Sequence, residues 1–195
     1  MIQVIFPNQF YYSITSPNKK ELVDGIKNAK VDKIRSSTIT WNSICGVEVQ
    51  SLYPNEILPL LYPSLELFFK DLEIDKKIVM TDVWRNTYKR GTFQDIHSHV
   101  SDKLNSNPFN DLSGCVFLED SRDDFGSFYF FNRYADLSPP WKEIFQNKGL
   151  DCTSISVNYK AGDVIFFPSS MLHGVTVQQS QNLRRTLSFN ISFLP

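Results

Sequence analysis

The sequence has few of the features that stabilise small secreted proteins or anchor a chain in a membrane. Its three cysteines are odd in number and show no motif spacing, which argues against a disulfide framework and favours a reducing compartment. No charged segment followed by an apolar run opens the chain, so no signal peptide is predicted. The most apolar segment, Ile57 to Phe69, contains Pro59, Pro63 and Glu66 and is too short to span a bilayer. We therefore expect a cytoplasmic protein without a membrane partner.

An excess of charge of one sign is also missing. The chain has 20 basic and 21 acidic residues, and its basic residues are scattered apart from pairs such as Arg184-Arg185. Because nucleic-acid binding needs clustered Lys and Arg, we expect no nucleic-acid partner. Hydrophobic residues make up 42% of the chain, which is enough for the core of one domain. We predict a single domain over residues 1–195, with residues 1–75 as a helical and extended support and residues 76–195 as the core.

Hydrophobic patterns predict helices first and strands afterwards. Apolar spacing indicates helices over residues 19–29 and 54–72, and the two prolines of the second predict that it splits into turns. Eight short antiparallel strands separated by turns are typical of a two-sheet jelly roll, the cupin-like double-stranded β-helix. The fold class is therefore mainly β with N-terminal helices (α+β). The predicted strands are 78–88, 95–99, 112–119, 126–132, 153–159, 164–167, 174–178 and 184–193.

Histidine is scarce, and its placement predicts a metal site. The chain has three histidines, and His97 and His99 are separated by one residue within a predicted strand. Residues i and i+2 of a strand point to the same face, so these two imidazoles can reach one metal ion. Neutral imidazole is a common ligand of iron, zinc, copper and nickel. His173 could complete the set from a neighbouring strand; the alternative is three unrelated surface or hydrogen-bonded histidines.

An arginine opens the last predicted strand, eleven residues after His173. Alternation places Arg184 and Thr186 on one face of this strand, and Arg185 on the opposite, apolar face. A buried guanidinium beside a hydroxyl matches a carboxylate through two parallel hydrogen bonds. We therefore predict a carboxylate clamp of Arg184 and Thr186, with Arg185 as the rival. The alternative is that both arginines are solvated charges at a strand end.

In this order the motifs resemble the iron(II)- and 2-oxoglutarate-dependent oxygenases, and most closely a family of small oxygenases of this class with a His-x-His motif. The resemblance covers about residues 78–193, and residues 1–75 match only loosely. The ordered set is specific, although no single piece is. The pieces are Trp84-Arg85-Asn86, His97-Ser98-His99, Leu112-Ser113-Gly114, Gly162-Asp163, Phe167-Pro168, His173 and Arg184-x-Thr186-x-Ser188-Phe189-Asn190.

The resemblance implies an enzyme that binds iron(II) and uses 2-oxoglutarate and O2 as co-substrates. Iron would be held by the three histidines, and the far carboxylate of 2-oxoglutarate would pair with Arg184 and Thr186. Asn86 and Tyr88 share a strand face and would hydrogen-bond the co-substrate, whereas Trp84 and Tyr129 are better explained as core or rim. The implied reaction hydroxylates an unidentified substrate, a small molecule or a protein side chain, and releases succinate and CO2.

The sequence departs from the general class at one ligand. That class holds iron with two histidines and one carboxylate, usually as His-x-Asp/Glu, and here His99 stands at the carboxylate position. Three candidates for the third ligand stay open: His99, which the related family favours, Asp95 on the face of His97, and Asp102 in the following loop. Two other functions stay open, namely a three-histidine cupin dioxygenase without 2-oxoglutarate and a non-catalytic jelly-roll binding module. The bound metal and a homodimeric state are open as well.

Overall fold

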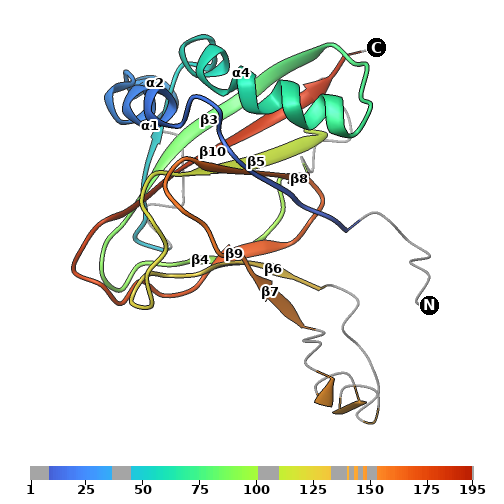
Figure 1. Cartoon of the computed structure of the whole chain (residues 1–195). Coiled ribbons are helices and arrows are strands. Elements are labelled where there is room, and N and C mark those ends of the chain that lie inside the picture. The colour runs from blue at the N-terminus through green and yellow to red at the C-terminus, as the bar shows by residue number, and fades with distance from the viewer. Residues whose placement is uncertain are drawn as a thin grey trace.

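Two facing β-sheets, with helices on the outside of one, form the protein (Figure 1). The computed structural model describes residues 9–36, 45–100, 110–132, 140, 143–144, 147–148 and 153–194. The larger sheet has the order β1-β8-β5-β10-β3-β2: Tyr12–Thr15, Asp163–Pro168, Leu112–Phe117, Arg184–Phe193, Ile78–Tyr88 and Glu48–Ser51. The smaller sheet has the order β4-β9-β6-β7: Gln94–His97, His173–Val175, Phe128–Phe131 and Ser154–Ser156.

The connectivity is that of the predicted jelly roll. Along the chain, β3, β5, β8 and β10 lie in the larger sheet, and β4, β6, β7 and β9 lie in the smaller one. All the pairings between these strands are antiparallel. The prediction of eight strands after the helical part, and of the double-stranded β-helix, is therefore confirmed. The first part of the chain also adds β1 and β2 to the larger sheet, beside β8 and β3.

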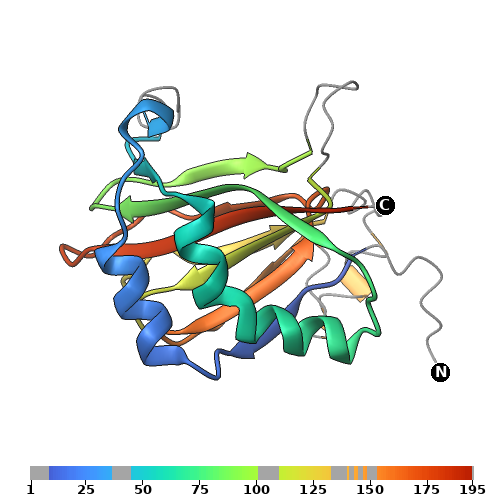
Figure 2. The same ribbon diagram turned by 90° about the horizontal axis from the view of Figure 1, so that it is seen from above.

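Helices α1 (Lys19–Asn28) and α4 (Pro54–Asp71) cover the outer face of the larger sheet (Figure 2), while the short α2 spans Lys33–Ser36. α4 stays one helix through both of its prolines, so the predicted split is wrong. Packing explains this, because most helical stability in proteins comes from burial of an apolar face. The buried face of α4 consists of Ile57, Leu61, Ser64, Leu65 and Phe68. No helix among the described residues is long and apolar enough to cross a membrane.

Alternation along β10 separates two different interiors. Leu187, Phe189 and Ile191 point outward and are fully buried between the larger sheet and the helices. Thr186 and Arg184 point inward, into the space between the two sheets. A second, largely aromatic cluster fills that inner space, with Tyr88, Phe117, Phe128 and Phe167 among its members. The outer core therefore stabilises the sheet by apolar burial, and the inner space is available to polar groups.

Gly114 sits at the crowded centre of the larger sheet. It lies opposite Phe189 on one side and Phe166 on the other, in the strand that pairs with both β10 and β8. A Cβ at this position would lie 2.2 Å from Cζ of Phe189 and 2.6 Å from the carbonyl oxygen of Ile165. The absence of a side chain at Gly114 therefore allows the outer core to close over the sheet.

We expect Gly114→Ala to lower the free energy of unfolding by about 1–3 kcal/mol, because an overpacked core must shift its side chains and backbone. Urea denaturation followed by circular dichroism measures the change. Val79→Ala, at a partly exposed position of β3, is the matched control and should change the value by less than about 0.5 kcal/mol. A Gly114→Ala protein as stable as the wild type would contradict this account of the core.

Candidate functional site

The three histidines converge at one end of the space between the sheets. His97 is the last residue of β4 and lies directly opposite His173, the first residue of β9. The ring centroids are 4.4 Å apart for His97 and His173, 4.8 Å for His99 and His173, and 5.3 Å for His97 and His99. One nitrogen from each ring lies within 4.8 Å of the others. We call these three residues the histidine cluster.

The route by which His99 reaches the cluster differs from the prediction. β4 ends at His97, and its ladder with the three-residue β9 is irregular, so His99 lies beyond the strand. The backbone N–H of His99 instead donates to the carbonyl oxygen of Ser169, at 2.9 Å. The expected alternation within a strand over 95–99 is therefore wrong. The two imidazoles nevertheless come together, because the turn before β9 fixes the backbone of His99.

Hydrogen bonds at Nδ1 orient all three rings. Nδ1 of His97 bonds the carbonyl oxygen of Asp95 at 2.7 Å, and Nδ1 of His173 bonds that of Met171 at 3.0 Å. Nδ1 of His99 lies 2.8 Å from Oδ1 of Asn190. A carbonyl oxygen only accepts, so each of these Nδ1 atoms carries the proton. Nε2 is then the nitrogen that each ring can offer to a metal, an arrangement typical of metal-binding histidines.

Burial keeps the imidazoles neutral. It lowers the pKa of all three histidines, with that of His99 lowered to about 4 and that of His173 lowered well below 6.5. The mutual proximity of the rings adds to this effect for His99 and His173. Three neutral nitrogens suit iron, zinc, copper or nickel. The donor set therefore fits a divalent transition metal, and the chain supplies it without proton release near neutral pH.

The carboxylate candidates for the third ligand do not join the cluster among the described residues. The side chain of Asp95 is exposed, and its Oδ2 atom lies 4.0 Å from Sγ of Cys45. The group of residues that could hold a metal consists of the three histidines without Asp95. Asp102 lies outside the residues that the structure describes. The geometry thus favours His99 over Asp95 as the third ligand.

A buried network behind His99 was missed by the sequence analysis. Oγ of Ser113 donates to Oδ1 of Asn190 at 2.8 Å and lies 2.7 Å from Oγ of Ser169. Oγ of Ser113 is also 3.0 Å from Nδ1 of His99. All three network residues are almost fully buried. The sequence does contain a pattern that could have predicted this network. Ser113 in the Leu-Ser-Gly motif and Asn190 in the Phe-Asn motif are polar residues at inward positions of apolar strands.

The side chain of Trp84 lies against the cluster, and that of Tyr129 lies elsewhere. The Trp84 and His99 ring centroids are 5.3 Å apart, so the indole covers one side of that imidazole. Tyr129 lies opposite Gly174 in the smaller sheet, and its hydroxyl would be 2.9 Å from a Cβ placed there. It therefore covers the backbone of β9, and the preferred interpretation of Tyr129 as a rim residue agrees with this position.

Arg184 lies in the inner space and is 1% exposed. Its guanidinium carbon is 4.7 Å from the ring centroid of Tyr88 and 5.5 Å from that of Tyr159. Nε donates to the hydroxyl of Tyr159 at 2.8 Å, whereas Nη1 and Nη2 have no hydrogen-bond partner among the described residues. A buried, incompletely paired cation is costly, so this site is suited to an anion that accepts two hydrogen bonds.

The other predicted binding residues lie on the same inner face of the sheet as Arg184. Thr186 and Asn86 lie opposite each other in the sheet, and Nδ2 of Asn86 donates to Oγ1 of Thr186 at 3.2 Å. Oδ1 of Asn86 is buried and has no hydrogen-bond partner in the described part of the chain. Tyr88 donates its hydroxyl hydrogen to Oε1 of Gln94 at 2.5 Å. We call Arg184, Thr186, Asn86, Tyr88 and Tyr159 the arginine recess; Tyr159 is the member that the sequence analysis missed.

Arg185 faces the other way, as alternation predicted. It forms an ion pair with Glu119 at 2.6 Å, and its backbone N–H also donates to that carboxylate. Its charge is therefore already neutralised on the outer side of the sheet. The alternative in which both arginines are solvated strand-end charges is wrong, because Arg184 is buried.

A family model described as "Putative 2OG-Fe(II) oxygenase" matches residues 82–190. This range contains the three histidines and every residue of the arginine recess. A search of curated proteins finds no significant match.

Solved structures of this kind resemble the chain over nearly its whole length. The viral collagen prolyl hydroxylase vCPH from Paramecium Bursaria Chlorella virus-1, solved with 2OG, is 16% identical with a TM-score of 0.62, over 98% of this chain and 100% of that chain. HygX from Streptomyces hygroscopicus, with nickel and 2-oxoglutarate bound, is 12% identical with a TM-score of 0.58, over 96% and 84%. A Pseudomonas putida prolyl-4-hydroxylase is 14% identical with a TM-score of 0.58, over 96% and 94%. At these identities the likeness shows a shared fold.

The lowered pKa of His99 predicts how acid affects the metal-free protein. The unfolded chain binds a proton at this histidine below about pH 6.5, whereas the folded chain resists protonation down to about pH 4. The free energy of unfolding should therefore fall as the pH drops through this window. His99→Gln should remove up to about 3 kcal/mol of that fall. Urea denaturation at pH 7.5 and pH 4.5 measures it, and an unchanged pH dependence in the variant would contradict the burial of a neutral ring.

Proposed function

The chain belongs to this family of 2OG-Fe(II) oxygenases, since the family model matches more than half of it, and from that premise we propose which residues bind the metal and the co-substrate. The protein is an oxidoreductase with the jelly-roll fold that uses iron(II), 2-oxoglutarate and O2. When bound, iron(II) and 2-oxoglutarate together activate O2 to hydroxylate a substrate, with release of succinate and CO2. The roles of individual residues are the proposal.

We propose that Nε2 of His97, His99 and His173 are the three protein ligands of the iron. The observation that carries this proposal is the convergence of one buried and two half-buried imidazoles, kept neutral by desolvation, whose Nδ1 atoms are all occupied by hydrogen bonds. This set departs from the usual two histidines and one carboxylate. Without a ligand carboxylate, the bound metal keeps more of its positive charge, so anionic co-substrate oxygens should bind it more strongly.

The arginine recess is our candidate for the far carboxylate of 2-oxoglutarate. Nη1 and Nη2 of Arg184 supply two donors, and the ring of Tyr88 stacks near the guanidinium. Tyr159 accepts from Nε and so holds the planar group in place before the ligand arrives. Asn86 and Thr186 lie on the same inner face and add hydrogen-bonding groups along the co-substrate. A dicarboxylate anchored here would direct its other end toward the histidine cluster.

Asn190 and Ser113 act as positioning residues in this proposal. Asn190 accepts the Nδ1 proton of His99 and thereby fixes the tautomer that exposes Nε2. Ser113 holds the oxygen of Asn190 and links it to Ser169. Many metal-binding histidines donate this proton to a carboxylate, which makes the imidazole more basic. Here the acceptor is the neutral amide of Asn190, so His99 stays a weaker base. The metal site therefore has no negative charge on this partner of His99, as it has none among its three ligands.

Neither alternative function, a three-histidine dioxygenase without 2-oxoglutarate or a non-catalytic module, explains both the oriented histidines and the arginine recess. A three-histidine dioxygenase that works without 2-oxoglutarate does not need a buried guanidinium whose two amino groups lack a partner in the described part of the chain. A non-catalytic jelly-roll module does not need oriented, desolvated imidazoles. Family membership and the arginine recess together favour the 2-oxoglutarate-dependent reaction.

We also propose a reducing, cytoplasmic setting, without a nucleic-acid partner. Cys45 and Cys115 are free and buried, and burial raises the pKa of the Cys115 thiol to about 12, so it stays protonated and unreactive. Cys152 lies outside the described residues. The near balance of acidic and basic residues supports the lack of a polyanionic partner. A homodimeric state stays a prediction.

Metal binding is tested by thermal melting under anaerobic conditions with Mn(II) as an iron substitute. A hundredfold excess of metal over its dissociation constant should stabilise the wild type by about 2.7 kcal/mol. His97→Ala should abolish the shift in melting temperature, because two imidazoles hold the ion far less well. Ser98→Ala, between the two histidines, is the matched control and should keep the shift. A shift that survives in His97→Ala would exclude this cluster as the metal site.

The arginine pair offers an internal control for co-substrate binding. Arg184→Met should weaken 2-oxoglutarate binding to the Mn(II) protein by about 10- to 100-fold, because it removes the charge-assisted hydrogen bonds to the far carboxylate. Arg185→Met should leave it within about twofold, because that residue pairs with Glu119. Isothermal titration calorimetry measures both, and Mn(II) affinity should be unchanged in each. Equal losses in the two variants would contradict the recess.

Without ligand, Arg184→Met should be no less stable than the wild type, since it replaces an incompletely paired buried cation with an apolar side chain of similar length. Chemical denaturation of the metal-free proteins measures this. A loss of more than about 2 kcal/mol would mean that the guanidinium is structural.

A further inference from the structure

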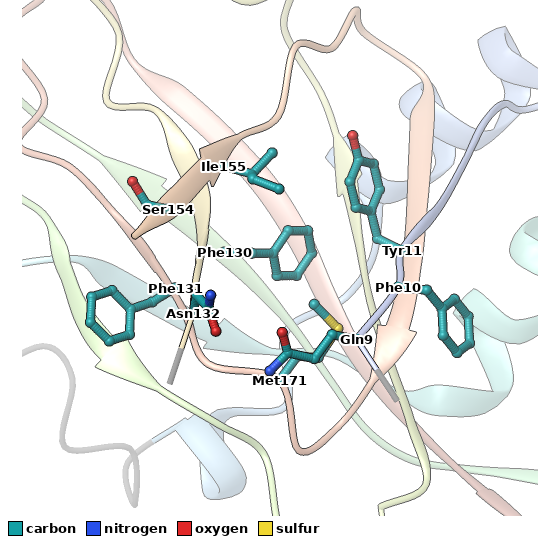
Figure 3. A pocket seen from close by; sticks show the side chains of 9 residues that line it. All are labelled: Gln9, Phe10, Tyr11, Phe130, Phe131, Asn132, Ser154, Ile155 and Met171. Atoms are coloured by element: carbon teal, nitrogen blue, oxygen red, sulfur yellow. The ribbon is translucent and has the colours of Figure 1, made fainter. Parts of the chain in front are cut away.

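A hollow lined mostly by apolar side chains lies beside the histidine cluster, and its lining includes neither the three histidines nor any residue of the arginine recess (Figure 3). Its volume is about 360 Å³. Its apolar lining comes from the segment before β1, from β6 and β7, and from the turn before β9. We call it the aromatic pocket, defined by Phe10, Tyr11, Phe130, Phe131, Ile155 and Met171.

The aromatic pocket shares two residues with the surroundings of the metal ligands. Phe130 lies directly opposite His173 in the smaller sheet, and their ring centroids are 6.4 Å apart. The carbonyl oxygen of Met171 accepts the Nδ1 proton of His173. A molecule that occupies the pocket therefore contacts the residues that orient one metal ligand.

The chemistry of the lining defines the ligand. No lining residue is charged, and the polar groups among the side chains are the amides of Gln9 and Asn132 and the hydroxyls of Ser154 and Tyr11. An ionic group placed there would lose hydration without gaining a partner of opposite charge. Phe10, Tyr11, Phe131 and Ile155 are among the exposed large hydrophobic residues, so apolar area stays open to solvent. Aromatic walls around an uncharged space favour a ligand with an apolar ring.

The shape favours a small molecule over a chain segment. Tyr11 stacks on Phe130 with ring centroids 5.2 Å apart and a 24° angle between the planes. This contact connects the segment before β1, at the edge of the larger sheet, to the smaller sheet. Figure 3 shows both side chains among those that line the hollow. The remaining volume is at the low end for small-molecule sites.

We propose that the aromatic pocket is the substrate subsite of this oxygenase, and that it binds the apolar ring of a small, uncharged organic molecule. The inference rests on the proposed function, because it uses the histidine cluster as the reacting centre. Binding beside His173 would keep the substrate near the metal while the arginine recess holds the co-substrate from the other side.

The test uses indole as an uncharged ring compound and indole-3-carboxylate as its charged counterpart. Protein loaded with Mn(II) and saturated with 2-oxoglutarate is titrated into each compound, and broadening of the compound's proton resonances by the paramagnetic ion is recorded. Zn(II) protein gives the diamagnetic reference. Indole should be broadened in the Mn(II) protein, and indole-3-carboxylate should need at least tenfold more protein for the same effect.

Two variants and two matched controls locate the site. Tyr11→Ala should weaken indole binding about five- to tenfold through loss of one aromatic wall. Ile155→Lys should weaken it by more than tenfold, because it places a cation in the pocket. Tyr62→Ala and Ile34→Lys change exposed residues on α4 and α2 and should stay within twofold of the wild type.

The outcomes distinguish a failure of the proposed oxygenase function from a failure of the substrate subsite alone. Calorimetry first establishes binding of Mn(II) and 2-oxoglutarate; if neither binds, the proposed function fails and this inference fails with it. If both bind but indole is not broadened, or the pocket variants behave like their controls, the subsite alone is wrong. If the capped peptide acetyl-Gly-Gly-Trp-Gly-Gly-amide is broadened at tenfold lower protein concentration than indole, the claim of a small-molecule substrate is overturned.

Discussion

The short antiparallel pairing of β4 with β9 is the constraint on which the site depends. It places His97 opposite His173 where the smaller sheet ends, and the turn before β9 then binds the backbone of His99. Each imidazole donates its Nδ1 proton to an oxygen of the protein, so no ring can rotate without losing that hydrogen bond. The metal site is thus rigid before any metal arrives, which lowers the cost of binding.

The two faces of the larger sheet have different roles. Its outer face buries Leu187, Phe189 and Ile191 under α1 and α4, and this apolar contact supplies stability. Its inner face carries Arg184, whose Nη1 and Nη2 have no hydrogen-bond partner within the described ranges, so its burial opposes folding. A chain can keep such a costly group only if other burial compensates for it. The helical layer therefore supports function indirectly, because its apolar contacts with the sheet compensate for the burial of Arg184, although none of its residues reaches the site.

Sequence reasoning succeeded where function follows from strand alternation. The period of two along β10 was enough to distinguish Arg184 from Arg185, because Leu187, Phe189 and Ile191 mark the face of Arg185 as the outer one. The same reasoning failed at His99, since alternation applies only while a strand keeps its partner and β9 has three residues. It also failed for α4, where packing against the sheet outweighed the two prolines.

The sequence by itself determined the jelly-roll fold, the three histidines as the metal-site candidates and the inward arginine, because each follows from residue type and local periodicity. Only the tertiary structure decided which groups lie around them. Tyr159 reaches Arg184 from 25 positions away, and Asn190 reaches His99 from 91. The stacking of Tyr11 on Phe130, which shapes the aromatic pocket, likewise joins the segment before β1 of the larger sheet to β6 of the smaller sheet. No local pattern encodes such contacts, since they depend on how the two sheets face each other.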